Sequence, residues 1–203
     1  MAMNEPGDIM LRIAIAIAAA AIALPQPAAA GIIVYQATLS GAAEAPPNAS
    51  PATGTVTVTI DDVLDTMRVQ ATFSGLLGNT TAAHIHGLTA LPNTGTAGVM
   101  TRVPSFVGFP LGVTSGSMDQ TYDLTLTSSY SGTFITAQGG LANAQTALLL
   151  ALASDRAYFN VHTTSFGGGE IRGFLHEVAT PEPASMALLG VGLLGLVAGR
   201  RRA

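Results

Sequence analysis

Alternation of apolar and polar residues recurs along this chain and restricts its fold more than any other feature. The segment GTVTVTID (54–61) alternates valine with threonine, and DTMRVQATFSGL (65–76) places Met67, Val69 and Phe73 on one face. A period of two residues is that of a β-strand buried on one side. The pattern predicts about seven strands and therefore a β-sandwich, with strands within 31–41, 54–61, 65–76, 81–87, 120–129, 156–164 and 169–178.

One segment, residues 139–155, departs from this alternation. Its leucines recur at helical spacing, which predicts a single amphipathic helix with Asn143 as a candidate N-terminal cap. Elsewhere, turn-forming residues separate the strands. The aspartates between 61 and 65 and the glycine-rich SFGGG (165–169) each predict a hairpin.

Residues 1–30 are typical of a secretory signal peptide. Arg12 supplies the positive charge, residues 13–24 form an apolar run that is short for a bilayer span, and small residues at Ala28 to Ala30 suit cleavage. Acidic residues ahead of this run are unusual, which makes Met10 a candidate start. An uncleaved anchor helix is the alternative interpretation.

The segment 180–203 combines three features in order: Pro181-Glu182-Pro183, an apolar run over 184–199, and closing arginines. The apolar run predicts a transmembrane helix, and the arginines favour a cytoplasmic end. This order resembles the PEP-CTERM sorting signal of Gram-negative bacteria, which implies processing by an exosortase, a membrane protease. An ordinary tail anchor in the inner membrane is the alternative. Both place the central part of the chain on the non-cytoplasmic side.

The composition excludes several classes of protein. The chain has no cysteine, so any metal must be held by histidine, carboxylate or backbone oxygen. Between residues 31 and 180 lie four arginines, no lysine and nine acidic residues, a net charge of about −5. The absence of a basic stripe argues against a nucleic-acid partner. Gly-x-Ser-x-Gly, P-loop and dinucleotide-binding motifs are also missing from the sequence.

His84 and His86, in AHIHG (83–87), carry the most specific chemistry in a chain with four histidines. At positions i and i+2 of a strand, both imidazoles lie on one face, about 6.5 Å apart at the backbone. They can converge on one copper or zinc ion. A pair does not close a tetrahedral site, and His162 in YFNVHTT is the candidate third ligand. The alternative is a structural set of rings that hydrogen-bond to neighbouring backbone.

Glu170 and Arg172, in GEIRG, are expected to stabilise this site without binding the metal themselves. Placed at i and i+2, they share a face, and the preferred interpretation is a salt bridge that positions the glycine-rich turn. Arg172 holding an anion beside a metal is the alternative. The predicted turn places His162 opposite Arg172 and His176 away from the site. Glu44, in the proline-rich segment 41–54, is a candidate extra ligand or arginine partner, and the preferred interpretation of this segment is a rigid connection between the first two strands.

Three motifs in register resemble the CHRD (chordin-type) domain. They are LSGAAEAPP at 39–47, AHIH at 83–86 and NVHTTSFGGGEIRG at 160–173. The resemblance covers nearly all of a domain predicted over residues 31–179. It implies a module found in chordin and in many bacterial exported proteins, a class without an established enzymatic activity.

A fainter similarity, to copper/zinc superoxide dismutase, rests on His84, His86 and Arg172. The zinc loop, bridging histidine and disulfide cysteines of that family have no counterpart here, which makes dismutase activity the weaker hypothesis. The expected fold is therefore an all-β, immunoglobulin-like or dismutase-like sandwich with one short helix. A signal helix and a transmembrane helix would flank it.

Three functions fit these observations. The favoured one is an exported, exosortase-sorted protein of the cell surface or extracellular matrix. Its CHRD module would be non-catalytic, would interact with an envelope or extracellular polymer, and would hold Cu or Zn through His84, His86 and His162. The second is a Cu/Zn-dependent redox enzyme. The third is a purely structural envelope module whose histidines are hydrogen-bonded.

Overall fold

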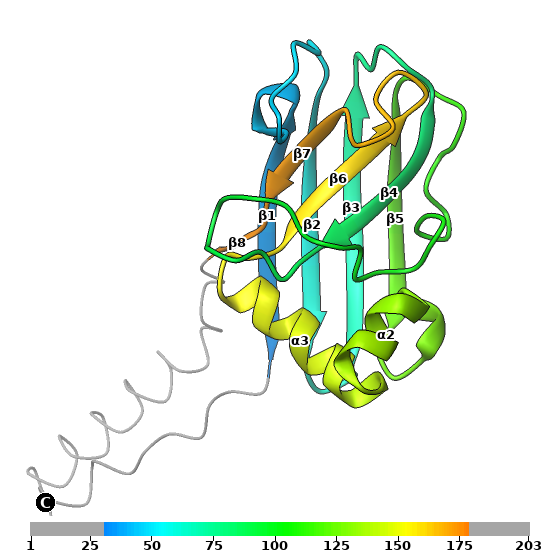
Figure 1. The fold of residues 1–203 in the computed structure, drawn as a ribbon. Helices are drawn as coiled ribbons and strands as arrows, with labels where there is room; N and C mark the ends of the chain where they lie inside the picture. Colours follow the sequence, from blue (N-terminus) through cyan, green and yellow to red (C-terminus); the bar gives the residue numbers. More distant parts are fainter. Residues whose placement is uncertain (1–30, 179–203) are drawn as a thin grey trace, which may run out of the picture. The chain divides into compact units, whose positions relative to one another are not determined.

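The computed structural model describes residues 31–178 (Figure 1). The expected signal peptide (1–30), the sorting motif and the transmembrane helix (184–199) lie outside these described residues. No helix within the described range is long and apolar enough to cross a membrane.

Eight antiparallel strands form one curled sheet, which confirms the all-β prediction (Figure 1). The order across the sheet is β4-β6-β7-β1-β2-β3-β5, and β8 pairs with β1. The strands are β1 (Ile32–Ser40), β2 (Thr53–Asp61), β3 (Thr66–Ser74), β4 (Thr80–His86), β5 (Gly116–Asp123), β6 (Tyr158–Thr163), β7 (Ile171–Phe174) and β8 (His176–Val178).

Strands β2 and β3 form the predicted hairpin, and their alternation determines which side faces the core. Val56, Val58 and Ile60 of β2 are buried, whereas the threonines between them face outward. At the turn, the Asp61 carboxylate accepts the N–H groups of the two residues that start the connection, Val63 and Leu64. This side-chain acceptor replaces strand pairing and allows the chain to reverse.

Strand β5 begins and ends earlier than the predicted 120–129. The Asp123 carboxylate accepts hydrogen bonds from both the backbone N–H and the hydroxyl of Thr125, and this local turn ends the strand. Residues Thr127–Ser129 then form a short 3₁₀ helix, so the bounds of this predicted strand were wrong.

The predicted helix is present as α3 (Leu141–Ala153), preceded by a second short helix, α2 (Gly132–Gln138). The residue that precedes α3 is Gly140, and Asn143 does not cap the helix: its amide donates to the Gln138 carbonyl instead. Seven residues are too few for a helical period to be seen in the sequence, which explains why α2 was missed. Both helices contribute buried residues to the core beside the sheet (Figure 1).

The half of the sheet formed by β4, β6 and β7 has two different faces. Residues of one parity face the core and are fully buried: Ala83, Ile85, Phe159, Val161 and Ile171. Residues of the other parity are polar or aromatic and lie under the connections 87–115 and 164–170: His84, His86, Tyr158, Asn160, His162 and Arg172. This outer face therefore holds the three candidate ligands.

Candidate metal centre

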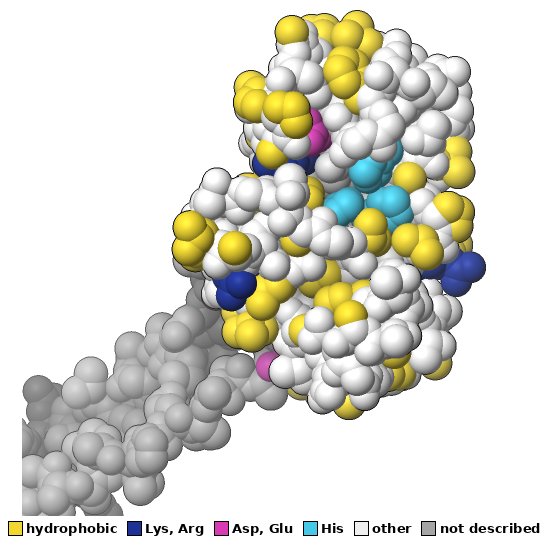
Figure 2. Space-filling model, viewed as in Figure 1, with side chains coloured by type: hydrophobic (Ala, Val, Ile, Leu, Met, Phe, Trp, Pro, Cys, Tyr) yellow, Lys and Arg dark blue, Asp and Glu magenta, His cyan; other side chains and the backbone are white. Residues whose placement is uncertain are grey.

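His84, His86 and His162 lie together on the outer face of β4 and β6. The ring centroids are 5.7 Å apart for His84 and His86, 5.2 Å for His84 and His162, and 5.6 Å for His86 and His162. One nitrogen of each ring lies within 4.8 Å of the other two. Figure 2 shows histidine side chains gathered at the surface in the middle of this face. The structure thus brings together the three residues proposed from the sequence.

Backbone carbonyls determine which nitrogen of each ring is free. Nε2 of His84 donates to the Pro104 carbonyl (2.7 Å), and Nδ1 of His86 donates to the Ala97 carbonyl (3.0 Å). Nδ1 of His162 donates to the Gly167 carbonyl (3.0 Å). A carbonyl oxygen can only accept, so the hydrogen-bonded nitrogen carries the proton and the other nitrogen presents a lone pair.

The three lone pairs are buried and have no partner. His84 Nδ1, His86 Nε2 and His162 Nε2 are among the buried polar atoms of residues 31–178 without a hydrogen bond. An unsatisfied buried acceptor costs about 1–3 kcal/mol. Three such atoms on rings this close together fit a cation that accepts electron pairs from all of them.

Burial keeps these rings neutral. It lowers the pKa of His84 to about 4, with a further contribution from His162, and it also lowers the pKa of His86 to about 4. Burial lowers the pKa of His162 as well, against the opposing hydrogen bond to Gly167. Neutral imidazole is the form that binds metal, so the rings do not have to lose protons at neutral pH.

An aromatic and cationic layer adjoins the histidines. The Tyr158 ring stacks on His86, with centroids 4.9 Å apart and planes at 11°, and its hydroxyl lies 3.3 Å from the Ala97 carbonyl. The guanidinium of Arg172 lies over the Tyr158 ring, 4.7 Å from its centroid. Arg172 therefore makes a cation–π contact with Tyr158, and Tyr158 in turn packs on His86.

Two family models match parts of the chain. The model of the CHRD domain matches residues 35–175. The chain belongs to the CHRD domain family. The model of the PEP-CTERM protein-sorting motif matches residues 179–202, which confirms the proposed sorting signal. No curated protein and no solved structure matches the chain.

Within the CHRD domain, the predicted salt bridge between Glu170 and Arg172 is wrong. Arg172 instead lies beside Glu44, with Nε 3.8 Å from Oε2, and donates to the Ala43 carbonyl. The predicted register was also wrong: Asn160, rather than His162, lies opposite Arg172. The observed pairs centre the turn on Phe166, one residue before the assumed Gly167, and this offset moves the partner of Arg172 by two residues.

Glu44 is an arginine partner, and it lies apart from the three ligand nitrogens. A Cβ added at Gly169 would lie 2.4 Å from Asn160 Oδ1 and 2.7 Å from Glu44 Oε1, so both unpartnered oxygens flank this glycine. Gly169 has a φ of +130°, which other residues rarely adopt. Burial raises the pKa of Glu44 to about 7, against the influence of Arg172.

Two residues of the site were missed at the level of sequence. Tyr158 and Asn160 occupy the same face of β6 as His162, and their positions at every second residue of YFNVHT would have allowed this to be predicted. The fourth histidine, His176, lies away from the cluster, as expected, and its Nδ1 is 3.0 Å from a carboxylate oxygen of Asp155.

We expect the metal-free domain to lose stability as the pH falls from 6.5 towards 4. In this interval the unfolded chain protonates His84 and His86 at their ordinary pKa of 6.5, whereas the folded state keeps them neutral. The unfolded state therefore binds more protons, and acid favours it. Glu44 titrates in the opposite sense, so the informative quantity is the difference from a His84→Gln/His86→Gln variant. Urea unfolding across the interval measures it, and an identical pH dependence of the two proteins would contradict the assignment.

Proposed function

We propose that the CHRD domain is a non-catalytic binding module that holds one copper or zinc ion between His84, His86 and His162. The observation that carries this proposal is the set of three carbonyl hydrogen bonds, each leaving one buried lone pair in the cluster. Hydrogen bonds of this kind orient the rings of metal-binding histidines and determine their tautomers.

The donor set supports copper or zinc over harder cations. All three donor atoms are imidazole nitrogens, and the cluster among residues 31–178 includes no carboxylate. Imidazole suits zinc and copper, whereas calcium and magnesium prefer oxygen ligands. The three donor atoms lie within 4.8 Å of one another, a spacing that suits nitrogens sharing one zinc ion at about 2.0–2.1 Å.

The sorting motif supports a place for the mature protein outside the cytoplasm. A PEP-CTERM motif implies recognition by an exosortase, export, and transient anchoring in the membrane before processing. We infer that the processed protein resides at the cell surface or in the extracellular matrix, where an envelope or extracellular polymer is its partner. Fractionation of host cells tests this inference, and a processed chain found only in the inner membrane would argue against it.

Metal analysis of the full chain purified from its native host tests the metal site. We expect about one copper or zinc per chain, and a higher unfolding temperature after addition of that metal to stripped protein. Stoichiometric metal without turnover of superoxide separates the binding module from a redox enzyme. Protein that contains no metal, and whose stability is unchanged by copper or zinc, would leave only the structural role.

A further inference from the structure

The outer face of β1, β2, β3 and β5 presents rows of hydroxyl and amide side chains. One row crosses the four strands in register, and all of its members are exposed: Thr38, Thr55, Thr72 and Ser117. The adjacent row is formed by Gln36, Thr57, Gln70 and Asp119. Neighbouring strands lie about 4.8 Å apart, so each row is about 14 Å long.

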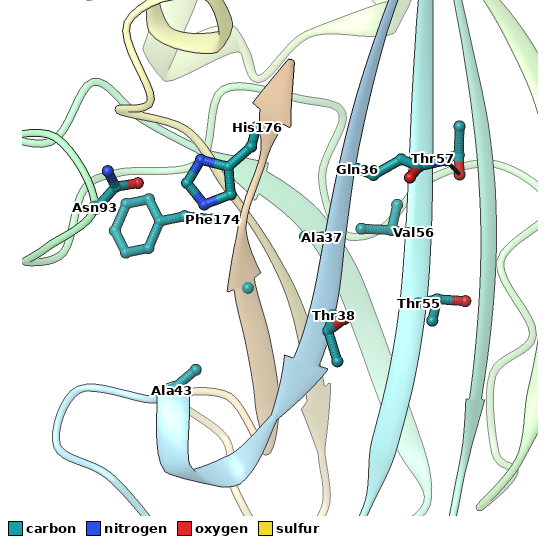
Figure 3. Close-up of a pocket in the computed structure, with 11 residues that line it drawn as sticks. Gln36, Ala37, Thr38, Ala43, Thr55, Val56, Thr57, Asn93, Phe174 and His176 are labelled. Carbon is teal, nitrogen blue, oxygen red and sulfur yellow. Dashed lines mark hydrogen bonds between the residues drawn. The ribbon is translucent and has the colours of Figure 1, made fainter. Parts of the chain in front are cut away.

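Three hollows lie side by side on these rows, and Thr55 lines all of them. Their volumes are about 790, 430 and 380 Å³. The largest is bounded on its other side by Phe174, His176 and Asn93 (Figure 3). The three hollows share lining residues, and we call them together the threonine furrow.

The polar groups of the threonine furrow are held in place by one another. The hydroxyl oxygens of Thr55 and Thr72 are 2.9 Å apart, and the Gln70 amide donates to Asp119 (3.1 Å). Arg68 engages the same carboxylate at 2.5 Å, which neutralises its charge. A ligand therefore meets a largely prearranged set of hydrogen-bonding groups, which lowers the entropy cost of binding.

The side chains that line the threonine furrow indicate which class of ligand it can bind. Among residues 31–178, no lysine or arginine lines the three hollows, which disfavours nucleic acids and acidic polymers. Few large apolar side chains are present, whereas a protein interface needs an apolar centre. Hydroxyl and amide groups can both donate and accept, as the hydroxyl groups of a sugar do. Phe174 adds an aromatic surface at one end.

We propose that the threonine furrow binds a neutral polysaccharide chain. The chain lies across β1, β2, β3 and β5, with Thr55 at its centre and one sugar ring against Phe174. This inference rests on the proposed place of the mature protein among envelope polymers. It does not depend on the metal centre.

Affinity electrophoresis of the full chain tests the furrow, using native gels that contain hydroxyethyl cellulose, dextran, galactomannan or alginate. At least one of the three neutral polymers is expected to retard the wild type, and alginate is not. In a Thr55→Val/Thr72→Val variant, the apparent affinity should fall roughly fivefold or more because two hydrogen-bonding groups are lost. Valine suits an exposed strand, so the fold should be kept.

Thr59→Val is the matched control. Thr59 belongs to β2 and faces the same side, but it lines none of the three hollows. Retardation by no neutral polymer, or by alginate alone, would overturn the proposal, as would equal effects of the double variant and the control. Thr38→Val gives a second variant within the furrow. Metal content, measured on the same samples, shows separately whether the metal proposal holds.

Discussion

Replacement of His162 by alanine is expected to abolish stoichiometric metal binding by the CHRD domain. The substitution removes one of three converging nitrogens and leaves a pair on β4 that cannot close a tetrahedral site. Loss of a group that merely orients a ligand lowers metal affinity about 10- to 100-fold, so loss of a ligand itself should cost at least about 100-fold. Competition with a chromophoric chelator measures the dissociation constants of wild type and variant.

His176→Ala is the matched control for this substitution. His176 is the histidine outside the cluster, it is exposed, and its partner is Asp155. Its removal is expected to leave the metal content and the dissociation constant unchanged. Equal losses in the two variants would mean that metal binds at dispersed histidines, which would contradict the assigned centre.

The stability of the metal-free proteins separates a metal site from a structural set. His162→Ala loses one hydrogen bond, to Gly167, but it also removes an unpartnered buried nitrogen, and each effect is about 1 kcal/mol. We therefore expect the unfolding free energies of stripped wild type and stripped variant to differ by no more than about 1 kcal/mol. With metal present, the wild type alone should gain stability. A large loss in the stripped variant would favour the structural role.

The strands that could be predicted from sequence are those that bury one face and expose the other, so that apolar and polar residues alternate along them. β2 and β3 are correct because each valine or isoleucine faces the core while its neighbour faces solvent. β5 was misplaced because the hydrogen bonds between Asp123 and Thr125 end it, whereas apolar alternation continues beyond them in the sequence. Side-chain competition for the backbone is a local event that periodicity does not record.

The candidate site, too, could be predicted from the sequence only in part. Two of its histidines share a strand, so their common face follows from spacing alone. The sequence does not identify Ala97, Pro104 and Gly167 as hydrogen-bond acceptors for the rings, because every residue carries a backbone carbonyl. Only the folded connections show which carbonyls reach the rings. Those carbonyls orient the three rings and determine which nitrogen of each ring has a free lone pair.

Glu170→Gln is expected to destabilise the domain by about 3 kcal/mol, because Glu170 is a fully buried acceptor for several donors. Its carboxylate accepts the N–H groups of Leu77 (2.6 Å) and Gly78 (3.2 Å). It also accepts the hydroxyls of Ser50 and Thr163, both at 2.7 Å. Glutamine would keep one acceptor oxygen and direct an N–H₂ group at the backbone N–H of Leu77 or Gly78, neither of which has another acceptor among residues 31–178. Urea unfolding at neutral pH measures the difference.

The pH dependence of this variant provides a second test of the same assignment. Burial alone would raise the pKa of Glu170, but its hydrogen bonds hold the pKa below the ordinary 4.5. The carboxylate therefore contributes its full stability above pH 4.5 and loses that contribution as the pH falls through the lowered folded value. The wild type should lose this contribution in acid, whereas Glu170→Gln has none to lose, so the two stabilities should converge. Asp119→Asn, at an exposed ion pair, should change stability little. If it matched Glu170→Gln in effect, the role assigned to the buried acceptor would be wrong.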